Sequence, residues 1–159
     1  MKKPLHSASL ALGAFAVLAP LTPSHACGLN WSWTIEDALK DANLGDKLVL
    51  LFFTGSDWSP RSIALDKQVL EKGEFSDLAA SKFALYLADF PQRTTPSVAF
   101  QKANTALAER LGIRHFPTIV ALKPDGSEFA RHTYSGETAT DMAGWLARCA
   151  EDYRKTAAR

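Results

Sequence analysis

An apolar run that leads into a capped helix constrains the fold of this 159-residue chain more than any other feature. Residues 48–53 read Leu-Val-Leu-Leu-Phe-Phe, a pattern that indicates a strand buried on both faces. Ser59 and Pro60 follow, and they suit the N-cap and the first position of a helix. The sequence therefore predicts a strand, a short loop containing Trp58, and a helix N-terminus, where free N–H groups and the helix dipole stabilise an anion.

Two serines, Ser59 and Ser62, occupy this helix start at the spacing of a Cys-x-x-Cys pair. A cysteine at the first position would have its thiolate stabilised and would become a nucleophile. A serine hydroxyl has no comparable ionised form near neutral pH and cannot form a disulfide. The stretch therefore indicates the geometry of a redox site without its sulfur atoms.

The first 26 residues have the pattern of a secretory signal peptide. Lys2 and Lys3 precede an apolar stretch, residues 10–19, that is too short to span a bilayer. The small-x-small triplet at residues 24–26 predicts cleavage after Ala26, which would place residues 27–159 in the periplasm or outside the cell. A lipoprotein anchored through Cys27 is the alternative, and it is disfavoured because Ser24 rather than leucine lies three residues before that cysteine.

Residues 27–159 have the length of one domain with a substantial core. Loss of the two signal-peptide lysines leaves 16 basic residues against 17 acidic ones, so the charge gives no indication of nucleic-acid binding. No further apolar segment is long enough to span a membrane. The oligomeric state is not indicated.

The two cysteines, Cys27 and Cys149, leave two interpretations open. An oxidising compartment would permit a disulfide between them. Cys149 also lies on an apolar stripe with Met142 and Leu146, which favours a buried, unreactive side chain.

The order of elements predicts an α/β domain with a central mixed β-sheet and helices on both faces. A parallel βαβ unit is expected first, followed by an antiparallel ββα unit. The expected helices cover residues 34–42, 60–72, 74–81, a segment that begins at Thr94-Thr95-Pro96 and closes at Gly112, and 138–155; the expected strands cover residues 47–54, 83–88, 117–122 and 127–133.

Three motifs resemble the thioredoxin-like proteins, particularly an exported bacterial group whose site reads F-T-G-S-D-W-C-x-x-C. Residues 53–62 match this site except at Ser59 and Ser62; residues 112–118 read Gly-Ile-Arg-His-Phe-Pro-Thr; and Asp125-Gly126 is followed by Tyr134-Ser135-Gly136. The resemblance covers about residues 31–153 and implies a thioredoxin-like fold.

The resemblance also implies the functional residues. Pro117 would follow a cis peptide bond, and Phe116 would offer backbone groups to an extended peptide. The two serines would replace the nucleophilic and resolving cysteines. A buried carboxylate beneath the site has no match, because the strand reads Leu51-Phe52-Phe53. The implied binding residues are Trp58, Pro60, Arg61, Phe116, Pro117 and Thr118.

Other kinds of site receive less support. Ser59 as a hydrolytic nucleophile would need His115 as its base, and no orienting acid accompanies them. His115 and His132 are the only histidines after residue 26, and the acidic residues lack ligand spacing, so no metal or cofactor is expected. Trp31 and Trp33 are either an aromatic binding patch or, more often for such residues, the edge of a core.

Two classes of function follow. The first is a redox-inactive binding module of the cell envelope that recognises peptide or protein partners around Trp58, Phe116 and Pro117. The second is a thiol-disulfide oxidoreductase whose active-site cysteines were replaced, or one that acts through Cys27 or Cys149. The sequence leaves open whether the protein is an enzyme and which partner it binds.

Overall fold

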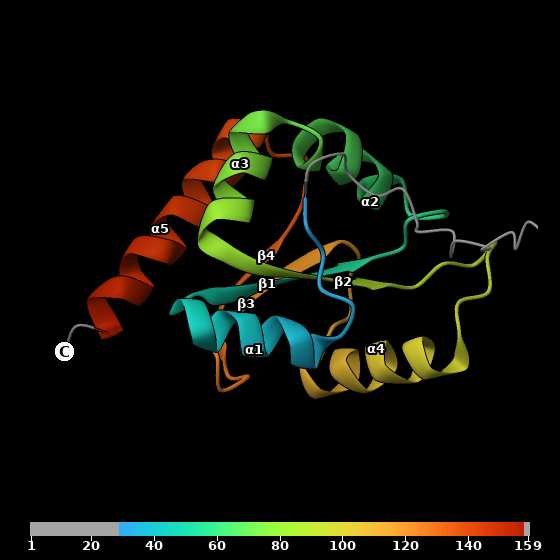
Figure 1. Ribbon diagram of the computed structural model, residues 1–159. Coiled ribbons are helices and arrows are strands. Elements are labelled where there is room, and N and C mark those ends of the chain that lie inside the picture. Colours follow the sequence, from blue (N-terminus) through green and yellow to red (C-terminus); the bar gives the residue numbers. More distant parts are fainter. Residues whose placement is uncertain (1–28, 158–159) are drawn as a thin grey trace, which may run out of the picture.

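The computed structural model describes residues 29–157, which form helices around a four-stranded sheet (Figure 1). Cys27 and the predicted signal peptide lie outside the described residues. The elements in chain order are α1 (Ile35–Gly45), β1 (Leu48–Thr54), α2 (Pro60–Leu65), the π-helix η1 (Asp66–Leu70), α3 (Gly73–Lys82), β2 (Phe83–Asp89), α4 (Val98–Arg110), β3 (Thr118–Leu122), β4 (Glu128–Thr133) and α5 (Ala139–Ala157).

The sheet has the predicted mixed topology, with strand order β2-β1-β3-β4. Strand β1 pairs parallel with β2 and antiparallel with β3, and β3 pairs antiparallel with β4. Phe52, for example, lies opposite Leu87 on one side and Ile119 on the other. The parallel pair requires the crossover through α2, η1 and α3, whereas a short turn joins β3 to β4.

Strand β1 is buried along its whole length because helices cover both faces of the sheet. Leu50 and Phe52 belong to the core cluster beneath α2, η1, α3 and α5, while Leu51 and Phe53 belong to the cluster beneath α1 and α4. Side chains alternate between the two faces of a strand, so a strand covered on both faces must be apolar at every position. This burial explains the apolar run in the sequence.

The predicted start of α4 is wrong. The helix begins at Val98, and the Ser97 side chain accepts a hydrogen bond from the Phe100 backbone N–H at 3.3 Å, so Ser97 is the N-cap. Thr94, Thr95 and Pro96 lie in the preceding loop. Serine and threonine are both good N-cap residues, so the local sequence offers several candidates and the packing of the chain decides among them.

The predicted single helix over residues 60–72 is also wrong in detail, because α2 ends at Leu65 and continues as η1. The sequence pattern gave no sign of this change. Leu65, Val69 and Leu70 are all buried, and their spacing fits the inward face of an ordinary α-helix equally well. Helix α3 then begins at Gly73, where the sequence predicted a stop.

Helix α5 buries the predicted stripe, since Met142, Leu146 and Cys149 all belong to the core. Burial raises the pKa of the Cys149 thiol to about 11, with Arg148 lowering it and Asp152 raising it to smaller extents. The interpretation of Cys149 as a buried small side chain is confirmed. Its pairing with Cys27 stays a prediction, because Cys27 is not described. None of the helices within residues 29–157 is long and apolar enough to cross a membrane.

We expect Cys149 to resist thiol reagents in the folded protein. With a pKa of about 11, roughly one thiol in a thousand is ionised at pH 8, and the sulfur is covered by the core. Site-resolved mass spectrometry after brief treatment with iodoacetamide should show little modification of Cys149 in native protein and complete modification in urea. Rapid modification of the native thiol would contradict this burial and reopen an enzymatic role for Cys149.

Candidate functional site

The loop between β1 and α2 places both serines at the helix start, where their hydroxyl groups serve as hydrogen-bond acceptors. The Ser59 side chain accepts from the Ser62 backbone N–H at 3.3 Å, as expected of an N-cap. The Ser62 hydroxyl accepts from the Gly55 backbone N–H at 3.1 Å. Ser59 is 5% exposed and Ser62 is 2% exposed. Both hydroxyls therefore hold the loop and are poorly accessible to a reactant.

Ser56 and Asp57 of this loop bind the end of β2 and the segment that follows it. The Ser56 backbone N–H and hydroxyl both donate to Asp89, at 3.0 and 2.6 Å. The Asp57 carboxylate accepts from the backbone N–H groups of Gln92 and Arg93, at 2.9 and 2.7 Å. The Gln92 N–H makes the largest contribution to lowering the pKa of Asp57, and the Arg93 N–H adds to it. The two loops are thus joined as one unit.

Trp58 lies in an aromatic cluster at this junction. Its indole N–H donates to the Phe90 carbonyl at 2.7 Å, which fixes the orientation of the ring. The Phe116 ring contacts Trp58 edge-on, with centroids 5.9 Å apart, and contacts Phe90 at 5.2 Å. The sequence predicted Trp58 and Phe116 for this site but missed Phe90. A sequence feature that could have revealed Phe90 is its position directly after a strand, in Asp89-Phe90-Pro91. That position places an aromatic side chain at the carboxyl edge of the sheet.

The remaining predicted residues lie around this cluster in different environments. Pro60 and Arg61 are exposed in the first turn of α2, whereas Pro117 and Thr118 are buried. The Phe116–Pro117 peptide bond is cis. The Thr118 hydroxyl donates to the His115 carbonyl at 2.7 Å, so it stabilises the loop before β3 and is not free to bind a ligand.

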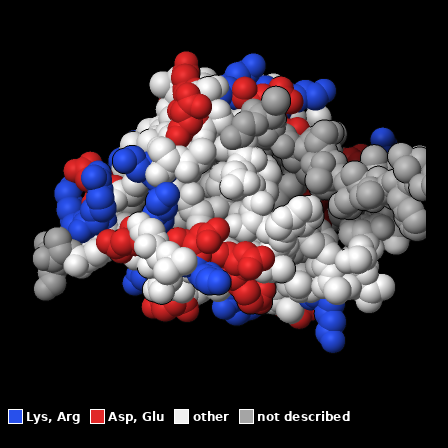
Figure 2. All heavy atoms as spheres, in the orientation of Figure 1, with Lys and Arg blue, Asp and Glu red and all other residues white. Residues whose placement is uncertain are grey.

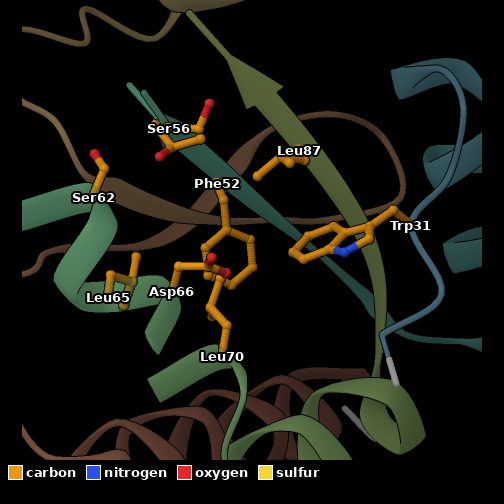
Figure 3. A pocket seen from close by; sticks show the side chains of 9 residues that line it. Trp31, Phe52, Ser56, Ser62, Leu65, Asp66, Leu70 and Leu87 are labelled. Atoms are coloured by element: carbon orange, nitrogen blue, oxygen red, sulfur yellow. The ribbon is translucent and has the colours of Figure 1, made fainter. Parts of the chain in front are cut away.

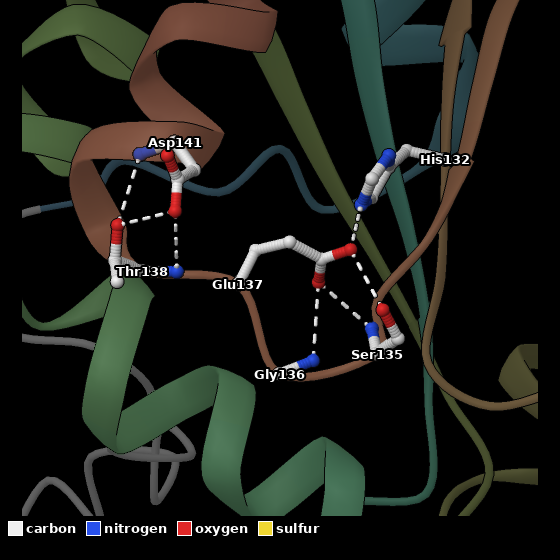
Figure 4. Close-up of polar contacts among 6 residues, drawn as sticks. All are labelled: His132, Ser135, Gly136, Glu137, Thr138 and Asp141. Carbon is white, nitrogen blue, oxygen red and sulfur yellow. Dashed lines mark hydrogen bonds and ion pairs between the residues drawn. The ribbon is translucent and has the colours of Figure 1, made fainter.

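A fourth loop, residues 134–137, borders Pro117, because the Tyr134 backbone N–H donates to the Pro117 carbonyl at 3.3 Å. Glu137 organises this loop by accepting hydrogen bonds from Ser135 and Gly136, and its carboxylate lies 3.2 Å from His132 (Figure 4). Burial raises the pKa of Glu137, but the Ser135 backbone N–H, the Glu137 backbone N–H, the Ser135 hydroxyl and the neighbouring His132 together lower it to about 2.

Beneath Ser62 lies a small cavity of about 30 Å³, lined mainly by apolar side chains (Figure 3). Asp66 also lines this cavity, from the first residue of η1 and four residues after Ser62. This carboxylate was not predicted, because the resemblance placed a buried carboxylate on β1, where the sequence has none. The cavity is lined by Trp31, Phe52, Thr54, Ser56, Ser62, Leu65, Asp66, Leu70 and Leu87.

Trp31 and Trp33 lie in different environments. Trp31 packs edge-on against Phe52, with centroids 5.3 Å apart, and its backbone bridges to Leu85 at the edge of the sheet. The interpretation as the edge of a core is therefore confirmed for Trp31. Trp33 is 73% exposed, so it does not share that role.

Neither alternative kind of site is assembled in the described part of the chain. His115 is exposed and makes no side-chain hydrogen bond to Ser59, whose hydroxyl is already engaged as the cap. Among residues 29–157, no group of three or more His, Cys, Asp or Glu side chains could hold a metal ion.

Comparison with known proteins identifies the family. Residues 35–150, most of the described chain, match the thioredoxin-like domain. The chain belongs to the thioredoxin-like family. It is 30% identical to the disulfide bond reductase DsbH of Chlamydia pneumoniae over 69% of its own length and 65% of the relative's length. It is 24% identical to the thioredoxin-related protein DsbJ of the same organism, over 76% of its own length and 35% of the relative's.

Solved structures agree with this assignment. A DsbH oxidoreductase structure superposes with a TM-score of 0.74 at 25% identity, covering 87% of this chain and 95% of that one. A thioredoxin from Thermus thermophilus gives 0.58 at 20% identity, covering 77% and 87%, which shows the shared fold. Against the full sequences, the chain spans about two thirds of the length of DsbH and about one third of DsbJ.

We expect Gly55→Ala to displace Trp58. A Cβ atom at residue 55 would lie 2.5–2.7 Å from the indole ring, and the hydrogen bond to Phe90 prevents the ring from moving without loss. Overpacking of this kind costs about 1–3 kcal/mol of the free energy of unfolding. Urea denaturation should show that loss, and near-UV circular dichroism should show a changed tryptophan environment.

Gly73→Ala is the matched control, because its new Cβ would meet only an Asp77 oxygen at 3.6 Å, an ordinary contact. If Gly55→Ala proved as stable as this control and left the tryptophan signal unchanged, the close packing of Trp58 on the loop would be wrong.

Proposed function

We propose that this protein is a binding module of the cell envelope that recognises extended peptide segments without exchanging disulfides. The observation that carries the proposal is the pair of serines at the helix start, whose hydroxyls both act as structural acceptors. In this proposal Ser59 and Ser62 stand where the exchange enzymes of the family carry cysteines. In this proposal the peptide binds on the surface around Trp58, Phe116 and Pro117, which we call the groove.

The chemistry of disulfide exchange supports the proposal that this protein does not exchange disulfides. Disulfide exchange needs a thiolate that attacks and a second thiol that resolves the mixed disulfide. Within residues 29–157 the sole cysteine is Cys149, which is buried in the face of α5 that packs on the core. Its raised pKa makes it a poor nucleophile as well as an inaccessible one.

The surroundings of Phe116 support the binding half. Its ring is half-buried against Trp58 and Phe90, while its backbone N–H and C=O make none of the turn and loop hydrogen bonds found among residues 29–157. An extended peptide can satisfy such groups by pairing along the chain, and its side chains can contact the aromatic rings. Pro60 and Arg61, both exposed, would border the bound segment.

An oxidoreductase with replaced cysteines is the second candidate, and the similarity to a protein named as a disulfide bond reductase favours it. In that case the serines would be substitutions in a chain whose native form carries sulfur. The native coding sequence at codons 59 and 62 separates the two candidates directly.

We propose the periplasm or the cell exterior as the location, with residues 1–26 removed as a signal peptide. The basic start, short apolar stretch and small-x-small triplet support this. The intact mass of the exported protein should correspond to a chain that begins at Cys27. A different start would contradict the cleavage site, and a diacylglycerol adduct would indicate a lipid anchor at that cysteine instead.

We expect the purified protein not to reduce insulin disulfides above background, and Ser59→Cys combined with Ser62→Cys to create activity. The loop, the cap and Trp58 are already in place, so two sulfur atoms are the missing component. The thiol introduced by Ser59→Cys should have a pKa below the ordinary value of about 8.5, because it lies at a helix N-terminus. The single variant Ser59→Cys should trap partners as mixed disulfides.

Two outcomes would oppose this account in different ways. Insulin reduction by the unmodified chain would show that another cysteine performs exchange. A folded double variant with two free, inert thiols that titrate near 8.5 would show that the loop lacks exchange geometry.

A further inference from the structure

Three arginines near the aromatic cluster, one in the first turn of α2 and two on loops, are free to bind a ligand. Arg61 lies three residues after Trp58, the Arg93 backbone is held by Asp57, and Arg114 precedes Phe116 by two residues. All three side chains are exposed. Among residues 29–157, none of them takes part in an ion pair or a side-chain hydrogen bond.

The acidic side chains near the cluster, in contrast, already have hydrogen-bond partners within the protein. Both carboxylate oxygens of Asp57 accept backbone N–H groups, and both oxygens of Asp89 accept from Ser56. Glu137 accepts from Ser135 and Gly136 and lies beside His132. The carboxylate oxygens around the groove therefore already accept hydrogen bonds within the protein, whereas the guanidinium donors of the three arginines face solvent.

This asymmetry is local. The formal charge of the whole chain is +1, and on the face shown in Figure 2 acidic and basic side chains are interspersed over α1 and the end of α5. A general attraction for anions is therefore not expected of this surface. Discrimination between ligands would arise at the groove itself.

We propose that the groove selects extended peptide segments in which acidic residues flank an apolar residue. The apolar side chain packs against Trp58 and Phe116, and the flanking carboxylates pair with Arg61, Arg93 and Arg114. Guanidinium groups suit this role because they bind carboxylates through two parallel hydrogen bonds. A lysine-rich segment is repelled by the same three cations, and the carboxylates of these loops already accept hydrogen bonds from neighbouring backbone and hydroxyl groups. This inference rests on the proposed peptide-binding function and specifies its ligand.

The test uses three dye-labelled decapeptides with an identical central Phe-Val pair and flanks of glutamate, glutamine or lysine. Fluorescence anisotropy at low and moderate salt gives the dissociation constants. Each exposed ion pair changes affinity by at most about fivefold, so we expect the glutamate peptide to bind roughly tenfold more tightly than the glutamine peptide at low salt. The lysine peptide should bind most weakly, and added salt should reduce the differences.

Substitutions distinguish the contribution of the arginines to binding from that of the aromatic residues. Changing Arg61, Arg93 and Arg114 together to glutamine should abolish the preference for glutamate while leaving the glutamine peptide bound. The matched control changes Lys40, Lys82 and Arg154 to glutamine; these residues are exposed and lie on α1, α3 and α5. The control should keep the preference. All six side chains are exposed, so both variants should stay folded.

Trp58→Ala and Phe116→Ala test the groove independently, and each should weaken all three peptides. Should they do so while glutamate and lysine peptides bind the unaltered protein equally, the acidic preference is overturned and peptide binding stands. Should the control variant lose the preference as fully as the arginine variant, the effect is one of overall charge and the assignment to these arginines is overturned. If no peptide binds, or if both aromatic variants bind as well as the unaltered protein, the proposed groove itself is overturned.

Discussion

The burial of β1 between two helical layers is the constraint on which the rest of this structure depends. Every residue of the strand is buried, and β2 and β3 pair with its two edges. The strand cannot shift by one residue without exchanging the side chains assigned to the two core clusters. The loop that follows Thr54 therefore starts from a fixed point, which is a requirement for a site whose geometry depends on loops.

Loop-to-loop hydrogen bonds extend this rigidity to the surface. Ser56 binds the last residue of β2, and Asp57 and Trp58 bind the segment after it. Trp58 also contacts Phe116 from the loop before β3. Three loops that are distant in sequence are thereby held together at the carboxyl edge of the parallel strand pair. The arrangement of the proposed binding surface therefore does not depend on reactive groups at the helix start.

Under the proposed function, serine takes over the structural role of the two positions at the start of α2 without their redox role. An oxygen acceptor forms stronger hydrogen bonds than sulfur, and here Ser59 caps α2 while Ser62 accepts from the Gly55 N–H. The family membership and the proposed loss of exchange are therefore compatible. The fold is determined by packing and hydrogen bonding, whereas exchange requires an ionisable sulfur.

The sequence by itself determined the elements whose signals are local: the buried strand, the Ser59 cap followed by proline, the apolar face of α5, and through their order the mixed sheet. Prediction from the sequence failed where a feature depends on contacts between distant segments. The start of α4 at Ser97, the change to a π-helix at Asp66, the place of that carboxylate beside the cavity, and the contact of Phe90 with Phe116 all depend on how the layers pack. Periodicity and capping act over three or four residues, but burial and loop contacts are set by segments tens of residues apart, and only the tertiary structure brings those segments together.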